Sequence, residues 1–137
     1  MTTAPLAGQA PALAAVAVGG AAGALGRYGL GLALPHASGT LPWATSAVNV
    51  TGCLLIGVLI VLVTEWRHPH PLVRPLLGTG VLGGYTTFST YAVDAHQMLG
   101  AGRITAAAAY VVGTLVTAVA ATWLGMRLAR AATGLPR

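Results

Sequence analysis

One segment of the sequence, residues 83–94, carries a denser set of polar and aromatic groups than any other. It reads Gly-Gly-Tyr-Thr-Thr-Phe-Ser-Thr-Tyr-Ala-Val-Asp and lies inside an otherwise apolar stretch. Two adjacent glycines weaken a helix, and hydroxyls can satisfy the carbonyls that a break releases. Free carbonyls at a broken helix are one way in which membrane proteins hold a small cation. The segment therefore predicts a helix break between Gly83 and Thr87 that is able to bind an ion.

Two aromatic residues follow the predicted break. Phe88 and Tyr91 are one helical turn apart and share a face. Ordinary aromatic packing explains that spacing, and so does an anion site, because the positive edge of a ring can face an anion. Asp94 is left to cap a helix or to pair locally, with an arginine among its candidate partners.

The composition places the whole chain in a membrane. Of the 137 residues, 55% are hydrophobic and only 7% are charged, whereas soluble domains have about a quarter charged residues. Apolar segments at about 10–34, 41–64, 72–98 and 104–126 are each near the roughly 20 residues that cross a bilayer. We predict an all-α membrane protein with four transmembrane helices in a single domain, 1–137. The polar groups of residues 83–94 must then face protein or water.

The distribution of basic residues predicts the orientation. All seven are arginines, and basic residues near the ends of spans favour the cytoplasm. One face of a four-span chain holds both termini and the second connector, and the other face has only Arg103. We therefore expect a multi-pass protein of the cell inner (plasma) membrane with both termini cytoplasmic. Most of the arginines flank the apolar segments and do not form the clustered basic patch that nucleic-acid binding would require. The arginines on the cytoplasmic face would be Arg67, Arg74, Arg127, Arg130 and Arg137.

The first and second spans hold further candidates. Gly19 and Gly23 form a small-xxx-small pair that predicts close helix packing. Arg27 lies about two turns from the end of its span, where it either draws anions into a vestibule or anchors the helix end. Thr45 and Asn49 share a polar face of the second span. The Asn49 amide is either an interhelical contact or a ligand for a dehydrated anion.

In the fourth span, hydroxyl groups follow one face at helical spacing, where they either join helices or line an aqueous track. These residues are Tyr110, Thr114 and Thr117.

Catalytic and metal-cluster patterns are missing from the sequence. Cys53 is the only cysteine, and His36, His68, His70 and His96 are not spaced with other ligands to form a metal site. No GxSxG, HExxH or Walker motif occurs. We expect no enzymatic activity.

Residues 83–91 resemble the GGLTTFSTF signature of the Fluc (CrcB) fluoride channels. Gly26-Arg27-Tyr28 and the spacing of Thr45, Asn49 and Gly52 match the same family. The resemblance covers all four spans in order. It implies a fluoride-selective channel that passively exports fluoride from the cytoplasm and so reduces its toxicity. It also implies an antiparallel dimer with two pores, a broken third helix and a structural sodium ion at the dimer centre.

The resemblance also assigns roles to residues. Gly83 and Thr86 match the positions whose backbone carbonyls hold the sodium ion. Tyr91 replaces the second of two pore phenylalanines, and Ala118 stands where a further hydroxyl is expected, with Thr117 one residue away. The remaining matches to the fluoride pore are Asn49, Phe88, Thr90, Tyr110 and Thr114.

Fluoride is strongly hydrated, so a dry pore must replace its water with donors such as an amide, hydroxyls and ring edges. The sequence supplies each kind. The rivals are a small multidrug-type proton-coupled transporter and a structural membrane protein. The former needs an acid in its first span, where this chain has Arg27.

The partner in the dimer is either a second copy of the chain or an oppositely oriented paralogue. The strong bias of loop charge favours one fixed orientation and hence the paralogue.

Overall fold

The computed structural model describes residues 8–66 and 69–134, which contain helices and no strand. Arg67, His68 and Arg137, which enter the predictions above, lie outside the described residues. Three helices are long and apolar enough to cross a membrane, namely Ala10–Ala33, Trp43–Glu65 and Ile104–Thr133. The expected all-α class is confirmed, and the long apolar helices support a membrane location.

The outer two helices begin and end with the residues that favour those positions. Helix α1 (Ala10–Ala33) has a proline in its first turn, where the missing N–H has no helical acceptor in any case. Helix α5 (Ile104–Thr133) ends at Gly134, whose φ of 70° is left-handed and suits glycine. The hydropathy pattern ended this helix near Met126, but it continues for about two further turns to Thr133.

The third apolar segment is interrupted, as expected, but the interruption begins later in the segment than expected. It consists of the π-helical η2 (Arg74–Leu82), the short α3 (Gly83–Tyr85) and α4 (Ser89–Gly100). The interruption covers residues 86–88, where Thr86 has extended backbone with ψ of 160°. Gly83, which we expected at the start of the break, is still helical.

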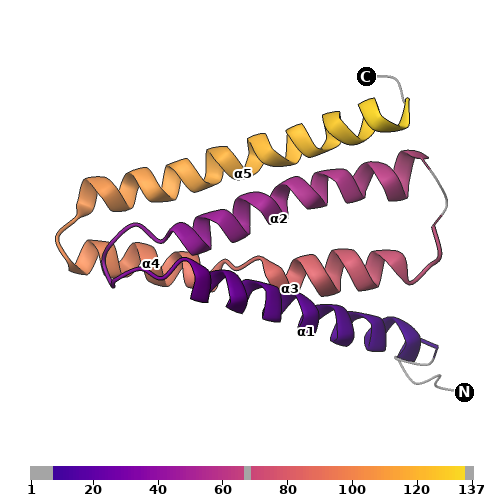
Figure 1. The fold of residues 1–137 in the computed structure, drawn as a ribbon, viewed down its shortest axis with the longest axis horizontal. Helices are drawn as coiled ribbons and strands as arrows, with labels where there is room; N and C mark the ends of the chain where they lie inside the picture. Colours follow the sequence, from indigo (N-terminus) through magenta and orange to yellow (C-terminus); the bar gives the residue numbers. More distant parts are fainter. Residues whose placement is uncertain (1–7, 67–68, 135–137) are drawn as a thin grey trace, which may run out of the picture.

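Glycines set the contacts between neighbouring helices. In Figure 1, α1 runs beside η2 and α3, and α2 (Trp43–Val61, continued by the π-helical η1, Leu62–Trp66) runs beside α5. A Cβ atom on Gly19 would collide with the Leu76 carbonyl, and one on Gly23 with the Val81 carbonyl. The predicted small-residue pair is therefore where α1 meets the third segment at close range.

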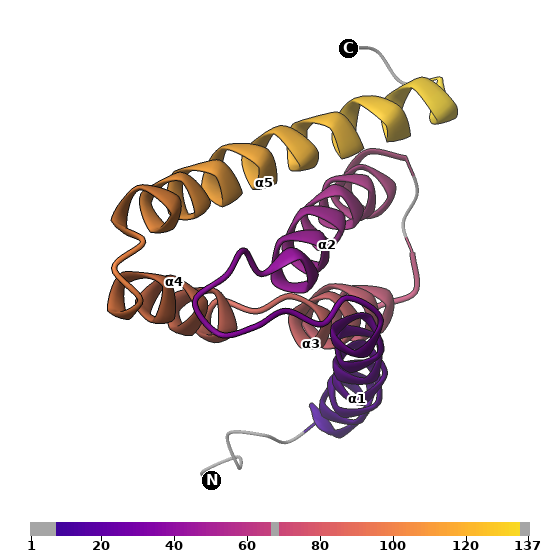
Figure 2. The same cartoon turned by 60° about the vertical axis from the view of Figure 1, so that its left-hand side comes forward.

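Different segments of the chain lie at the two ends of the molecule. The start of α1, the end of α5 and η1 lie at one end in Figure 1, and residues 34–42 and 101–103 lie at the other. Figure 2 shows residues 34–42 passing close to α4. Ser38 Oγ donates to Gln97 Oε1 at 3.1 Å, and Arg103 Nη1 donates to the Gly39 carbonyl at 3.1 Å. This long connector is therefore attached to α4 through Gln97 and to the residue before α5 through Arg103.

Candidate functional site

Asn49 in α2 binds the interrupted backbone of the third segment. Its Nδ2 donates to the Thr87 carbonyl at 2.9 Å, and its Oδ1 accepts from the Thr87 amide at 2.9 Å. The side chain therefore satisfies both backbone groups of a residue that has no helical partner for them. Asn49 thus makes the interhelical contact that was one of its two predicted roles. The second N–H of its amide is left for another acceptor.

The interruption also leaves two particular carbonyls without their usual donors. In a continuous helix the amides of Thr87 and Thr90 would bond to the carbonyls of Gly83 and Thr86. Instead the Thr87 amide donates to Asn49, and the Thr90 amide donates to the Thr87 hydroxyl at 3.1 Å. The Gly83 and Thr86 carbonyls thus fit a cation, because they are polar oxygens that no helical amide satisfies.

The hydroxyls after the interruption bond mainly to each other. Thr87 Oγ1 lies 3.0 Å from Thr90 Oγ1, to which it donates, and 3.3 Å from Ser89 Oγ. Thr87 is buried, whereas Ser89 and Thr90 are exposed. Together they form a polar start to α4 in place of a continuous helix.

A groove of about 610 Å³ runs along the interruption between α2 and α5. Most of the predicted site residues meet in it, although they come from three separate segments of the chain. Arg27, Thr90 and Tyr110 do not line it. The predicted residues in this groove are Asn49, Gly83, Thr86, Phe88, Tyr91 and Thr114.

The aromatic residues form a row that leads from the groove into the protein. The ring centroids of Phe88 and Tyr91 are 5.7 Å apart, and those of Tyr91 and Tyr110 are 5.2 Å apart. Phe88 is 79% exposed, whereas Tyr110 is only 5% exposed. The Tyr91 hydroxyl donates to the Val111 carbonyl at 3.1 Å. The hydroxyl that distinguishes Tyr91 from phenylalanine is therefore held by α5, and its ring contacts the other two.

The hydroxyls of α5 differ in what they contact. Thr114 lines the groove, and so does Ala118. Thr117 Oγ1 donates to the Gly113 carbonyl of its own helix at 2.6 Å, and Thr117 is not among the residues that line the groove. The Tyr110 hydroxyl is buried and has no hydrogen-bond partner among the described residues.

Arg27 lies in a second cavity, of about 560 Å³, on the other side of the interruption. Thr45, Thr87 and Thr90 also line it, so the cavity brings together residues of α1, α2 and the third segment. No ion pair of Arg27 occurs among the described residues. A cation without a fixed counter-charge suits the attraction of anions.

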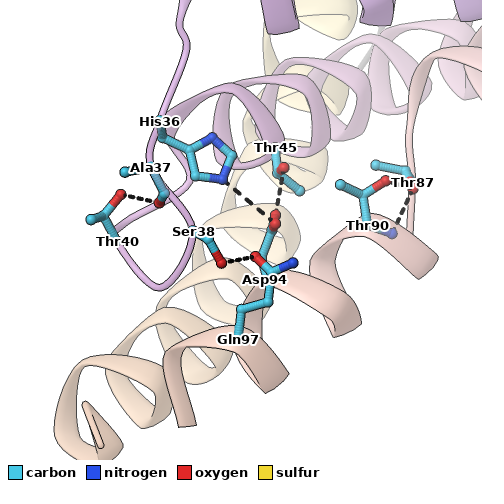
Figure 3. Close-up of polar contacts among 9 residues, drawn as sticks. All are labelled: His36, Ala37, Ser38, Thr40, Thr45, Thr87, Thr90, Asp94 and Gln97. Carbon is cyan, nitrogen blue, oxygen red and sulfur yellow. Dashed lines mark hydrogen bonds and ion pairs between the residues drawn. The ribbon is translucent and has the colours of Figure 1, made fainter. Parts of the chain in front are cut away.

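Asp94 has partners that the sequence did not indicate. Thr45 Oγ1 donates to Asp94 Oδ2 at 2.7 Å, and His36 Nε2 lies 3.6 Å from Asp94 Oδ1. Figure 3 shows the carboxylate between these two side chains. An arginine was one candidate partner, but a hydroxyl and an imidazole occupy that place. Asp94 is buried, with 6% exposure, so these contacts replace much of its hydration.

The family model described as CrcB-like protein, Camphor Resistance (CrcB) matches residues 14–126. "Fluoride-specific ion channel FluC 1" of Streptomyces coelicolor is 50% identical over 122 residues, which cover 89% of this chain and 79% of that protein. "Fluoride-specific ion channel FluC 2" of Nocardia farcinica is 49% identical over 125 residues, 91% of this chain and 89% of that protein. The protein of the same name, without a number, in Rhodospirillum centenum is 45% identical over 86% of this chain and 94% of its own length. With these matches across all of its long helices, the chain belongs to the CrcB-like family.

Proposed function

We propose that this chain is one subunit of a fluoride-selective channel that passively exports fluoride from the cytoplasm. The observation that carries the proposal is the groove in which Asn49, Phe88, Tyr91 and Thr114 meet. An amide, two ring edges and a hydroxyl are donors of the kinds that replace the water of a small anion. The names of the relatives support fluoride as the transported ion.

The proposed pathway also includes residues outside the groove. Thr90 faces the Arg27 cavity, and Tyr110 continues the aromatic row from Tyr91. In this proposal Arg27 raises the anion concentration at the mouth, and the hydroxyls of Thr90, Tyr110 and Thr114 take over from water inside. In this proposal the two halves of the third segment, η2 with α3 and then α4, act together as the broken third span.

The functional unit that we propose is an antiparallel dimer with two pores. Phe88 is exposed in the isolated chain, and a second subunit on the groove would enclose it. The carbonyls of Gly83 and Thr86 in each subunit would hold a structural sodium ion at the dimer centre. A bound sodium ion would supply a fixed positive charge between the pores.

Orientation decides which partner completes the dimer. Helix η2 begins at Arg74, and the last turns of α5 carry Arg127 and Arg130, at the end of the molecule where α1 begins and α5 ends. Arg103 precedes α5 at the other end. We propose that the termini are cytoplasmic in the plasma membrane and that the partner is an oppositely oriented paralogue. Cysteine-labelling topology mapping that finds equal populations in both orientations would favour a homodimer instead.

Fluoride efflux from liposomes tests the function. The protein is reconstituted, and the release of fluoride is recorded with an electrode beside a matched chloride experiment. Fluoride release without chloride release supports the channel. Proton flux driven by cationic drugs would support the multidrug-type transporter, and no flux from the protein with its co-expressed partner would support a structural role.

A further inference from the structure

The connector between α1 and α2 holds His36 in a fixed position. Ser38 is bonded to Gln97, and the Gly39 carbonyl is bonded to Arg103. Within the connector, Thr40 Oγ1 donates to the Ala37 carbonyl at 2.6 Å. Figure 3 shows the Ser38–Gln97 and Thr40–Ala37 bonds on either side of the connector and the His36 ring next to Asp94. The contact between imidazole and carboxylate is therefore part of an anchored structure.

His36 and Thr45 line the Arg27 cavity, and both contact Asp94 behind them. When His36 is neutral, the Asp94 carboxylate faces the cavity wall without a compensating charge on that side. Protonated His36 balances the carboxylate, which leaves the positive charge of Arg27 to act on an approaching anion.

Few other groups near this pair change charge close to neutral pH. From α1, Arg27 and Tyr28 line the cavity, and from α5, the Tyr110 side chain packs on α4 near the Asp94 carboxylate. Between about pH 5.5 and 7.5, arginine stays positively charged and tyrosine stays neutral, whereas histidine is the side-chain type that changes charge near neutral pH. His96 is also on α4 but is exposed and two positions away from Asp94. Of the described residues that line the cavity, His36 is the one histidine.

We infer that His36 makes the entry of anions into the Arg27 cavity depend on pH, with faster entry when the imidazole is protonated. This inference rests on the proposed fluoride channel. One elementary charge at the wall of a partly hydrated cavity changes the local concentration of an anion by roughly threefold to tenfold. Flux through the protein should rise by about that factor between pH 7.5 and 5.5.

Fluoride efflux is measured at pH 5.5, 6.5 and 7.5, with the same pH on both sides of the membrane. The rate from protein-free liposomes is subtracted at each pH, because hydrogen fluoride crosses lipid unaided. The wild type should show the rise. His36→Gln should give a low rate that does not change with pH, and His36→Arg should give a high rate that does not change with pH.

The matched control is His96→Gln, which removes an exposed imidazole from the same region and should keep the wild-type profile. A His36→Gln profile equal to that of the wild type would overturn the inference while leaving the channel intact. Loss of the profile in His96→Gln would also overturn it. Inactivity of both His36 variants, with an active wild type, contradicts the charge effect. No fluoride flux from the wild type at any pH would contradict the channel itself.

Discussion

Asn49 and Thr87 exchange two hydrogen bonds of 2.9 Å across the interruption of the third segment. The same amide therefore replaces both helical partners of Thr87 and lies in the groove of the proposed pathway. A bond of this kind contributes about 1 kcal/mol to stability, and more when its loss leaves a backbone group unpaired. In the proposed channel, this one side chain would serve both the structure and the conduction of the anion.

Asn49→Asp tests both the structural role of Asn49 and its proposed role in conduction. The carboxylate has no N–H for the Thr87 carbonyl and places a negative charge beside the proposed anion path. We expect fluoride flux to be abolished and the free energy of unfolding to fall by about 1–3 kcal/mol. Liposome efflux and thermal unfolding in detergent measure the two effects. Wild-type flux in Asn49→Asp would contradict a role for Asn49 in the pathway.

Two neighbouring glycines of α1 test the packing against the third segment. A Cβ on Gly23 would collide with the Val81 carbonyl, whereas a Cβ on Gly20 has no atom within 4 Å. Gly23→Ala should lower the free energy of unfolding by about 1–3 kcal/mol, since overpacking forces the backbones apart. Gly20→Ala should be neutral or raise it by up to about 1 kcal/mol through helix propensity. Thermal unfolding compares them, and equal midpoints for the two variants would show that α1 is not held at this distance.

Helical periodicity predicted those features that depend on one helix face. Gly19 and Gly23 lie where their spacing placed them, and Phe88 and Tyr91 do share a face. The interruption itself was also predictable, because hydroxyls and glycines accumulate there. The position of the interruption was less predictable from the sequence. The glycines at 83 and 84 are tolerated in the helix, and Gly84 packs closely on the Gly20 backbone. Asn49 stabilises the interruption one turn later.

The partners of Asp94 were beyond the reach of the sequence. His36 is in a connector with no periodicity, so only the path of residues 34–42 over α4 brings it to the carboxylate. The hydrogen bond of Tyr91 to Val111 has the same origin, because it depends on how α4 and α5 pack. Spacing within one segment gives no information about either distance.

Tyr91→Phe tests the meaning of the hydroxyl on the aromatic row. The substitution removes the bond to the Val111 carbonyl and leaves the ring between Phe88 and Tyr110. We expect stability to fall by about 1 kcal/mol and fluoride flux to stay within about twofold of the wild type. Tyr91→Leu removes the ring and should abolish most of the flux. If Tyr91→Phe is as inactive as Tyr91→Leu, the hydroxyl and not the ring is what conduction requires.

Removal of sodium tests the cation site formed by the Gly83 and Thr86 carbonyls. A ligand that binds only the folded protein stabilises it in proportion to the logarithm of its concentration above Kd. We expect the thermal midpoint in detergent to rise with the logarithm of the sodium concentration once that concentration exceeds Kd. N-methylglucamine at the same ionic strength is the control, because it is too large for the site. An identical midpoint in both salts would argue against a structural sodium ion.

Tyr110→Phe should affect flux more than stability, which is the opposite of what we expect for Tyr91→Phe. The Tyr110 hydroxyl is buried and has no partner among the described residues, and a buried polar group without a hydrogen bond lowers stability. Tyr110→Phe should therefore leave the free energy of unfolding unchanged or raise it. If the hydroxyl donates to fluoride in the pathway, the same variant should lose flux by about tenfold or more, since a hydrogen bond to an ion is worth about 1.5–3 kcal/mol. Thermal unfolding and liposome efflux on one preparation test both expectations.

Unchanged flux together with unchanged or higher stability would remove Tyr110 from the pathway. Reduced stability would show that its hydroxyl has a structural partner in the assembled protein.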